Sequence, residues 1–576
     1  MNPCVKIRHR SCAETDVAAL DASGVPPLLA RLYAARGVRA DETELSLRAL
    51  APPEAMRGVP EAAALLADAL ERQASILIVG DFDADGATSS ALARRALRDF
   101  GAERVSSLIP DRFTMGYGLT PALVEHATRF DPALLVTVDN GIGSIDGVRQ
   151  ARRNGWQVIV TDHHLPGEEL PEADVIVDPN QPGCDFPNKA LAGVGVIFYV
   201  MMRLRHELRA RGWFERRGRP EPNLAALLDL VALGTVADVV PLNHQNRILV
   251  DQGLRRIRAG RCRPGIAALF EVAGRDPSRA VASDLGFAIG PRINAAGRLE
   301  DMSIGVACLL ADDSSEALRH ARRLDELNRR RREVEGGMVE EARRILDGLK
   351  PSGARAFGIT LYEPHWHQGV VGLVASRVKS RAHAPVIAFA RDGEGRLKGS
   401  GRSIPGVHLR DALDRVDRMS PGLIERFGGH AMAAGLTLKE EGYAEFARRF
   451  DAVVRDLLGG EPLGEVLEVD GELPAGVLDL ETAEAVRFAG PWGQGFPEPL
   501  FEGRFEIVTQ RIVGERHLKL LLRPLDAPDD AFIDAIAFQH SELLRGEQAR
   551  LYYRLDVNQY RGRRGVQLIV ERVDCE

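Results

Sequence analysis

The stretch that decides the fold is Ser75-Ile-Leu-Ile-Val-Gly-Asp-Phe-Asp-Ala-Asp-Gly86. The apolar run at its start is typical of a short buried strand. Three carboxylates follow at alternate positions, on Asp81, Asp83 and Asp85, and a helical pattern then begins near Ser89. Acidic side chains therefore stand where a strand is followed by a helix, which is the edge at which open α/β sheets bind ligands.

Three neighbouring carboxylates repel one another unless a cation lies among them, and hard cations prefer oxygen ligands. A calcium loop of the EF-hand type is excluded, because it needs Glu at its twelfth position and Leu92 stands there when Asp81 is the first. A polar turn that caps a helix at Ser89 remains an alternative when this stretch is taken alone. The rest of the chain has to distinguish a cap from a cation site.

Length and composition limit the class of protein. The 576 residues predict three or four domains, and 45% hydrophobic with 27% charged residues is ordinary for a globular protein. No apolar run approaches a membrane span and the N-terminus lacks a basic-then-apolar signal, so we expect a cytoplasmic protein without a membrane partner. Six scattered cysteines without a C-x-x-C pair argue against zinc fingers and disulfides. Because the net charge is −7, any nucleic acid must bind in a local basic groove.

Polar side chains also follow later apolar runs of the chain. The groups concerned are Asp139, Asp162, His163, His164 and Asp238. Strands that alternate with helices predict a parallel sheet with helices on both faces, so these groups should share one edge with the acidic stretch. Carboxylates with neutral imidazole suit Mn²⁺, and carboxylates with water suit Mg²⁺. Two such ions can clamp the attacking and leaving oxygens of a phosphoryl displacement.

Four motifs in this order resemble those of the DHH phosphoesterase superfamily. They are Asp81-Phe-Asp-Ala-Asp-Gly86, Val138-Asp-Asn-Gly141, Asp162-His-His164 and Gly234-Thr-Val-Ala-Asp238. Further segments are similar to the bacterial single-strand-specific 5′→3′ exonucleases of that superfamily: Pro291–Arg298, Trp366–Gly372, Ser400–Ser403 and Gly428–His430. The resemblance covers about residues 50–576.

The resemblance implies a role for each matching residue. The implied ligands of Mn²⁺ or Mg²⁺, as two ions, are Asp83, Asp85, Asp139, His163 and Asp238. The implied catalytic residues are His163, His164, Asp162, Asp81, Asn294 and Arg298, with Asp162 fixing an imidazole tautomer. The implied substrate-binding residues are Arg112, Ser400, Arg402, Ser403, His367 and His430. Smaller members carry a histidine ligand where this chain has Val79, so Asp81 either replaces that ligand or orients the loop.

The resemblance and the order of the expected elements together imply an α/β protein in five parts. These are an N-terminal helical extension (1–50), a parallel-sheet DHH domain (51–310), a long connecting helix (311–352), an α/β DHH-associated nucleic-acid-binding domain (353–460) and an OB-like β-barrel (461–576). In the barrel, rings and positive charges mix in Tyr552, Tyr553, Tyr560, Arg561, Arg563 and Arg564. These side chains suit base stacking and phosphate contact, or equally an aromatic core beside a solvated basic turn.

We expect a metal-dependent exonuclease that degrades single-stranded DNA from the 5′ end to 5′-mononucleotides, in DNA recombination and repair. Polarity and DNA preference, and single-strand-binding protein and a helicase as candidate partners, are implied by the resemblance alone. Two alternatives remain. One is a DHH phosphodiesterase for short oligonucleotides or cyclic dinucleotides, against which the C-terminal barrel argues. The other is a non-catalytic DNA-binding scaffold, against which the intact acids and histidines argue.

Overall fold

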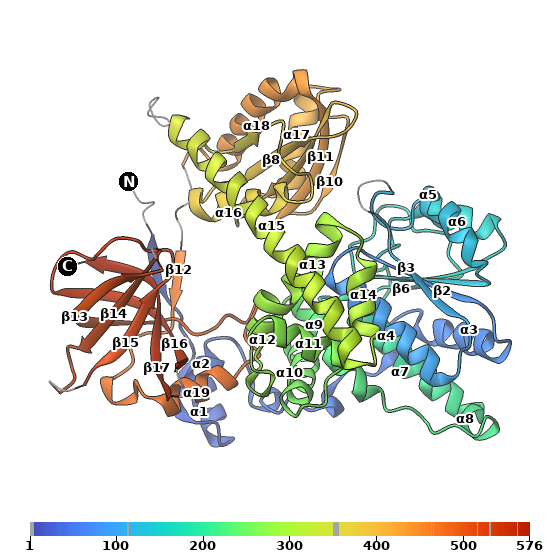
Figure 1. Ribbon diagram of the computed structural model, residues 1–576, viewed down its shortest axis with the longest axis horizontal. Helices are drawn as coiled ribbons and strands as arrows, with labels where there is room; N and C mark the ends of the chain where they lie inside the picture. Colours follow the sequence, from blue (N-terminus) through green and yellow to red (C-terminus); the bar gives the residue numbers. More distant parts are fainter. Residues whose placement is uncertain are drawn as a thin grey trace. The chain divides into compact units, whose positions relative to one another are not determined.

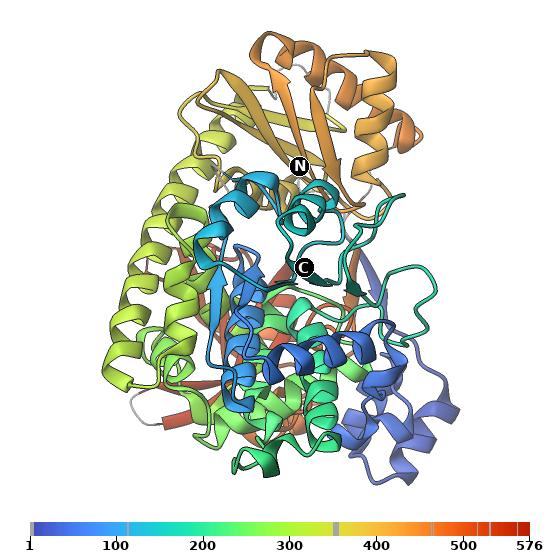
Figure 2. The same cartoon turned by 90° about the vertical axis from the view of Figure 1, so that its right-hand side faces the viewer.

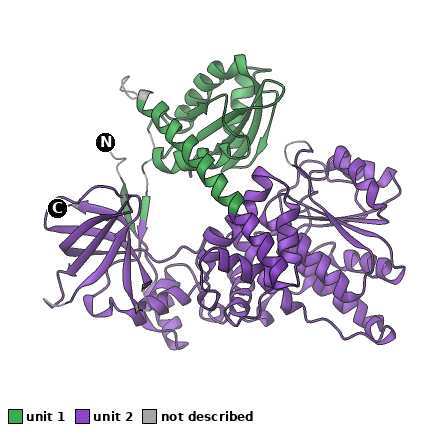
Figure 3. Ribbon diagram, in the orientation of Figure 1, with its two compact units in different colours: residues 1–8, 326–467 green, residues 9–325, 468–576 purple. Residues whose placement is uncertain are grey.

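The computed structural model describes residues 5–111, 115–349, 356–461, 464, 466–514, 516–528, 531–560 and 563–575. The chain forms two compact units, a smaller one of residues 1–8 and 326–467 and a larger one of residues 9–325 and 468–576 (Figure 3). Within the described ranges, no helix is both long and apolar enough to cross a membrane.

A parallel sheet forms one part of the larger unit, as predicted. Its strand order is β3-β2-β4-β5-β6, with β2 Ile76–Gly80, β3 Val105–Leu108, β4 Leu134–Val138, β5 Gln157–Thr161 and β6 Val175–Val177. β2 and β4 are buried along their whole length, because both sheet faces are covered. One face packs against α5 (Pro121–Ala127) and α6 (Ile145–Arg153), and the other against α3 (Val59–Glu71), α4 (Ala84–Phe100) and α7 (Gly193–Ala210) (Figure 1).

The helix after the acidic stretch starts at Ala84, five residues before the cap expected at Ser89. Asp83 is its N-cap, since its Oδ1 accepts hydrogen bonds from the backbone N–H groups of Asp85 (2.9 Å) and Gly86 (3.0 Å). Gly86 lets this turn close tightly, because a Cβ there would lie 2.4 Å from the backbone oxygen of Asp81. Asp83 is therefore a helix cap and also a member of the acidic stretch.

A group of helices completes the part of the larger unit that contains the parallel sheet. It comprises α8 (Trp213–Arg216), α9 (Leu228–Ala237), α10 (His244–Arg258), α11 (Pro264–Val272), α12 (Ala282–Asp284), a π-helix (Leu285–Ile289), α13 (Gly290–Leu299) and α14 (Ser303–Leu310). α9 is buried from Leu228 to Thr235 and packs against α4, α7, α10 and α13. Its C-terminal end places Asp238 at the carboxyl edge of the sheet.

The long connecting helix is confirmed as α15, Ser314–Leu349. Its apolar residues Ala317, Ala321, Leu324 and Leu327 recur at helical spacing and are buried. Gly336 and Gly337 lie within this unbroken helix, although glycine has a low helix propensity.

The smaller unit contains a mixed sheet with helices on both faces. Its order is β10-β11-β9-β8-β7, with β7 Ile359–Tyr362, β8 Val386–Arg391, β9 Arg396–Arg402, β10 Arg426–Gly429 and β11 Ala433–Lys439. α17 (Leu409–Met419) and α18 (Tyr443–Leu457) pack on one face (Figure 2). α16 (Val371–Ala382) and the C-terminal part of α15 pack on the other.

The C-terminal residues form the predicted closed barrel. Its order is β13-β14-β15-β17-β16, with β13 Phe501–Val513, β14 His517–Pro524, β15 Ile533–Ala537, β16 Gln548–Tyr560 and β17 Arg563–Cys575, and α19 (Leu480–Phe488) packs beside it. Tyr552 and Tyr553 are 3% and 0% exposed, so these rings belong to the core and cannot stack on bases. Arg564 forms an ion pair with Glu484, and Arg561 lies outside the described residues.

The N-terminal residues include a strand that was not expected. β1 (Lys6–His9) pairs with β12 (Val466–Val469), and α1 (Glu14–Ala22) and α2 (Pro27–Ala34) follow. Leu32 belongs to the core of the barrel. Just after α2, Arg36 forms a 2.8 Å ion pair with Asp470, and both side chains are almost fully buried. α2 and Arg36 are therefore part of the barrel domain.

We predict that Arg36→Met destabilises the larger unit by about 3–5 kcal/mol, because the Asp470 carboxylate is left buried without its cation. The double variant Arg36→Met/Asp470→Leu should recover much of this loss, since the buried charge is removed. Thermal unfolding of the three proteins measures the effect. Equal melting temperatures for wild type and the single variant would contradict this role of the ion pair.

Candidate metal centre

Acidic and imidazole side chains from several segments meet at the carboxyl edge of the parallel sheet. Three groups each have ligand atoms within 4.8 Å of one another: Asp85, His163 and Asp238; Asp81, Asp83 and Asp139; and Asp139, His163 and His164. The prediction that these residues share one sheet edge is therefore confirmed. Asp81, whose part was open, lies within the second group.

His163 lies between two carboxylates at the centre of this cluster. Its Nε2 is 3.1 Å from Asp139 Oδ1 and 3.5 Å from Asp238 Oδ2. Among the described residues, these three atoms are buried without a hydrogen-bond partner. Leaving such atoms unsatisfied costs about 1–3 kcal/mol each. A divalent cation would satisfy all three, and carboxylate oxygens with imidazole nitrogen fit Mn²⁺ or Mg²⁺.

Asp85 is fixed by the N-terminus of α7. Its Oδ2 accepts from the N–H of Gly193 (2.7 Å) and its Oδ1 from the N–H of Val194 (2.9 Å). A Cβ on Gly193 would lie 2.6 Å from the Cβ of Asp139, so the helix approaches both acids closely only because residue 193 is glycine. Sequence reasoning missed this contact, although the run Leu191-Ala-Gly-Val-Gly195 was a signal of a close backbone approach.

The buried acids raise one another's pKa. Burial, followed by repulsion from Asp238, raises the pKa of Asp85 to about 7. Burial, followed by repulsion from Asp83, raises the pKa of Asp238 to about 7 as well. The pKa of Asp139 lies well above its ordinary range for the same reasons, burial first and then Asp85. A bound cation removes this penalty, which is why the pKa shifts favour a metal site.

Asp162 forms an ion pair with His164, one of the two histidines of the cluster. Asp162 Oδ1 lies 2.7 Å from His164 Nδ1, and Asp162 Oδ2 accepts from the N–H of Ile142 at 2.9 Å. Burial opposes the charge on His164, yet the bond to Asp162 outweighs it and raises the pKa of His164 to about 9. The Tyr117 hydroxyl lies 3.3 Å from His164 Nε2, a neighbour that sequence reasoning did not single out.

The remaining predicted catalytic residues lie on α13. Asn294 Oδ1 accepts from the N–H of Ala84 at 2.7 Å, so this amide contacts the backbone at the end of the acidic stretch. Arg298 is one turn further along the same helix. This places α13 beside the acidic stretch.

Five of the predicted substrate-binding residues lie in the smaller unit, and Arg112 lies outside the described residues. Arg402 Nη1 donates to Ser400 Oγ at 3.3 Å, so these two are neighbours on β9. Ser403 is buried and donates to the backbone oxygen of Val407 at 2.7 Å, which gives its hydroxyl an internal partner. His367 Nδ1 accepts from Gly369 N–H, and His430 lies in the turn between β10 and β11.

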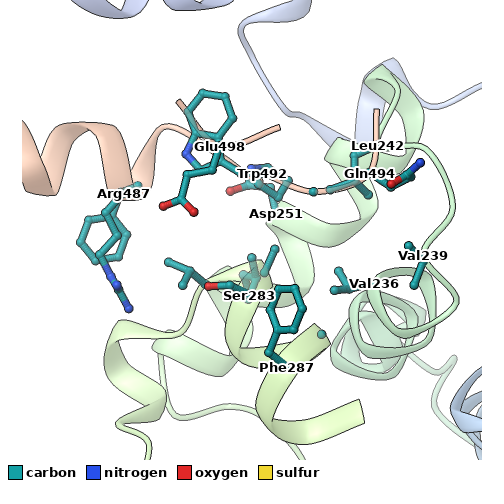
Figure 4. A pocket seen from close by; sticks show the side chains of 18 of the residues that line it. Val236, Val239, Leu242, Asp251, Ser283, Phe287, Arg487, Trp492, Gln494 and Glu498 are labelled. Atoms are coloured by element: carbon teal, nitrogen blue, oxygen red, sulfur yellow. The ribbon is translucent and has the colours of Figure 1, made fainter. Parts of the chain in front are cut away.

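A pocket of about 400 Å³ is lined by Val236 and Val239, which flank Asp238 in the sequence (Figure 4). Its walls come from the ends of α9 and α10, the π-helix and the loop before β13, and include Phe287 and Trp492 on opposite sides. Phe287 is 82% exposed. Val239, also in the wall, has φ +62°, a strained value for a β-branched residue, and directly follows Asp238. The pocket thus adjoins the cluster but supplies none of its ligand atoms, so the cluster carries the chemistry.

Comparisons with known proteins agree with this geometry. Residues 75–235 match the model of the DHH family, N-terminal domain, residues 356–456 the DHHA1 domain and residues 469–572 the RecJ OB domain. The chain is 55% identical to the single-stranded-DNA-specific exonuclease RecJ of Dickeya dadantii and 52% identical to that of Escherichia coli K12, over 100% of both chains in each case.

Solved structures give the same result. The crystal structure of RecJ in complex with Mn²⁺ from Thermus thermophilus superposes with a TM-score of 0.80 at 32% identity, over 99% of this chain and 80% of that one. Another RecJ, bound to manganese, is 36% identical with a TM-score of 0.58, over 70% of this chain and 97% of that one. The domain order, the cluster and the full-length similarity to these proteins show that the chain belongs to the RecJ family of single-stranded-DNA-specific exonucleases.

Proposed function

We propose that this chain hydrolyses single-stranded DNA from the 5′ end and releases 5′-mononucleotides, with Mn²⁺ or Mg²⁺ as cofactor. The observation that carries the proposal is the complete cluster of five aspartates and two histidines at one sheet edge, with buried ligand atoms that face one another. A catalytically inactive scaffold would have no use for such a costly arrangement. The full-length similarity to exonucleases that act on single strands supports the choice of substrate.

Two neighbouring metal sites fit the cluster best. One ion would be held by Asp81, Asp83 and Asp139, and the other by Asp85, His163 and Asp238. The two sites are neighbours, because Asp139 Oδ1 of the first lies 3.1 Å from His163 Nε2 of the second. Bound divalent ions supply activation of water and stabilisation of charge on the phosphate. His164, which its pKa of about 9 keeps protonated at neutral pH, offers a positive charge to a phosphate oxygen. Asp162 holds that ring in place.

The finer parts of the proposal rest on the family resemblance. They are the 5′→3′ polarity, a role in recombination and repair in the cytoplasm, and cooperation with a single-strand-binding protein and a helicase. Arg402 and Ser400 are the residues we assign to the 5′ phosphate, because a guanidinium beside a hydroxyl suits that group. Arg112 is assigned to the same task from its sequence position.

Asp139→Ala should lower cleavage of single-stranded DNA at least about a hundredfold, since even residues that only contact metal ligands contribute 10–100-fold. Binding of the strand should persist, because phosphate contacts elsewhere remain. Gel-based cleavage in Mn²⁺ and fluorescence anisotropy measure the two properties. Asp146→Ala, an exposed acid on α6, is the matched control and should behave as wild type. Near wild-type cleavage by Asp139→Ala would refute the assignment.

The pKa values of the cluster predict how the metal-free protein responds to pH. The folded pKa of Asp238, about 7, is raised above the ordinary value of 3.8, so its contribution to stability is present at low pH and lost as pH rises through 7. Asp238→Asn removes this loss. In metal chelator, the free energy of unfolding of wild type should fall by on the order of 2 kcal/mol more than that of the variant between pH 5 and pH 8.

Denaturant unfolding at the two pH values measures this difference. Asp146→Asn, whose carboxylate is exposed on α6, is the control and should follow wild type. If the free energies of unfolding of wild type and Asp238→Asn change equally with pH, the Asp238 carboxyl has its ordinary pKa in the folded protein. The neighbouring acids would then not raise that pKa.

Arg402→Ala tests the assignment of the 5′ phosphate. Hydrolysis of 5′-phosphorylated strands should fall about tenfold more than that of 5′-hydroxyl strands, because a charge-assisted contact of about 1.5–3 kcal/mol is lost only with the former. Initial rates on both substrates give the ratio, with Arg396→Ala on the same strand as control. An unchanged ratio in Arg402→Ala would place recognition of the terminus elsewhere.

A further inference from the structure

Asn140 fastens the strand that leads into the acidic stretch. Its Nδ2 donates to the backbone oxygen of Val79 at 3.1 Å and to that of Val138 at 2.9 Å. Val79 is near the end of β2 and Val138 is the last residue of β4, so one buried amide joins two parallel strands where their ladder ends. Asp139, directly before Asn140, has φ +63°, and this backbone turn is thereby held.

Asn294 fastens the other end of the same stretch from α13. Its Oδ1 accepts from the N–H of Ala84 at 2.7 Å, and Ala84 is the first residue of α4. The two elements are in close contact there, because a Cβ on Gly297 would lie 1.9 Å from the backbone oxygen of Phe82. Residues 80–83, which carry two of the acids, are therefore bounded by one amide that donates and one that accepts.

The loop needs this restraint because like charges surround it. Asp81 and Asp83 face Asp139 within one group, and Asp85 and Asp238 lie in the adjoining one. Repulsion would push the loop away from β4 in the absence of cations. Asparagine supplies both a donor and an acceptor without adding charge, which a carboxylate or an amine in its place could not do.

We propose that Asn140 and Asn294 are positioning residues that clamp both ends of the loop at residues 80–83 and so set the spacing between the two metal subsites. The inference deepens the proposed function and rests on its two-ion site. Neither amide touches substrate in this assignment. Each acts on the backbone that carries the metal ligands.

Asn140 uses its amide nitrogen as a donor, whereas Asn294 uses its amide oxygen as an acceptor. Replacement by aspartate should therefore affect the two positions differently. Asn294→Asp keeps the acceptor for Ala84 N–H, and the N-terminus of α4 offsets the repulsion between the new charge and the acids of the loop. Asn140→Asp loses both donated hydrogen bonds and places a carboxylate oxygen next to the backbone oxygens of Val79 and Val138, which repel it. We expect Mn²⁺ affinity to fall tenfold or more in Asn140→Asp and Asn294→Ala, and to stay within about threefold of wild type in Asn294→Asp.

Three readouts on the full-length protein apply to these variants. Isothermal titration with Mn²⁺ gives the affinity, electron paramagnetic resonance reports coupling between two bound Mn²⁺ ions, and hydrogen exchange of a peptide spanning residues 79–87 reports the loop without metal. The coupling should weaken, and exchange at the loop should speed up, in Asn140→Asp and Asn294→Ala only. The control is Asn223→Asp. Asn223 Oδ1 also accepts a hydrogen bond from a backbone N–H, that of Ala225, at the start of a short helix, but this residue is exposed.

Equal behaviour of Asn140→Asp and Asn294→Asp in affinity and exchange would overturn the clamp. If Asn140→Asp does not fold, the two Asn294 variants still test the clamp. The clamp requires Asn294→Asp to keep the Mn²⁺ affinity and the slow exchange that Asn294→Ala loses. If the wild-type protein shows no coupling between bound Mn²⁺ ions, the two-ion site is refuted. The difference in hydrogen exchange between the two Asn294 variants would then be the remaining test of the clamp.

Discussion

Confinement of negative charge at one edge of a parallel sheet is the constraint on which the rest of this structure depends. Five aspartates lie close enough to share ions, and burial raises the pKa of several of them. The surrounding elements counter the repulsion with backbone dipoles and amides. α7 directs two N–H groups at Asp85, α4 caps itself with Asp83, and α13 contributes Asn294. The fold thus tolerates a cluster whose negative charge is neutralised by bound cations or by protonation.

Helices that look structural are therefore part of the site. α9 is buried from Leu228 to Thr235, and its C-terminal end brings Asp238 beside His163. The approach of α7 depends on Gly193, and that of α13 on Gly297, because a side chain at either position would collide with the cluster or its loop. Val239, strained directly after Asp238, shows that the end of α9 is held in place by its surroundings rather than by its own preference.

Much of this was predictable from the sequence because the signals are local. The apolar runs before Asp81, Asp139 and Asp162 identified parallel strands, and parallel strands bring their carboxyl ends together. The 3.6-residue pattern also predicted a long connecting helix at 311–352, and α15 spans Ser314–Leu349. The contacts of Gly193 and Asn294 with the acidic stretch escaped prediction, because they join residues over a hundred positions apart and depend on tertiary packing. For Tyr552 and Tyr553, composition could not distinguish stacking from core, and burial decided for core.

The chemistry proposed for this family member requires two ions in defined places. The most direct measurement is anomalous X-ray diffraction at the manganese edge from crystals of the wild-type protein grown with Mn²⁺. Two peaks are expected, one among Asp81, Asp83 and Asp139 and one among Asp85, His163 and Asp238. Absence of a peak at this edge of the sheet, or peaks bound by other residues, would contradict the assignment of the cluster as the metal centre.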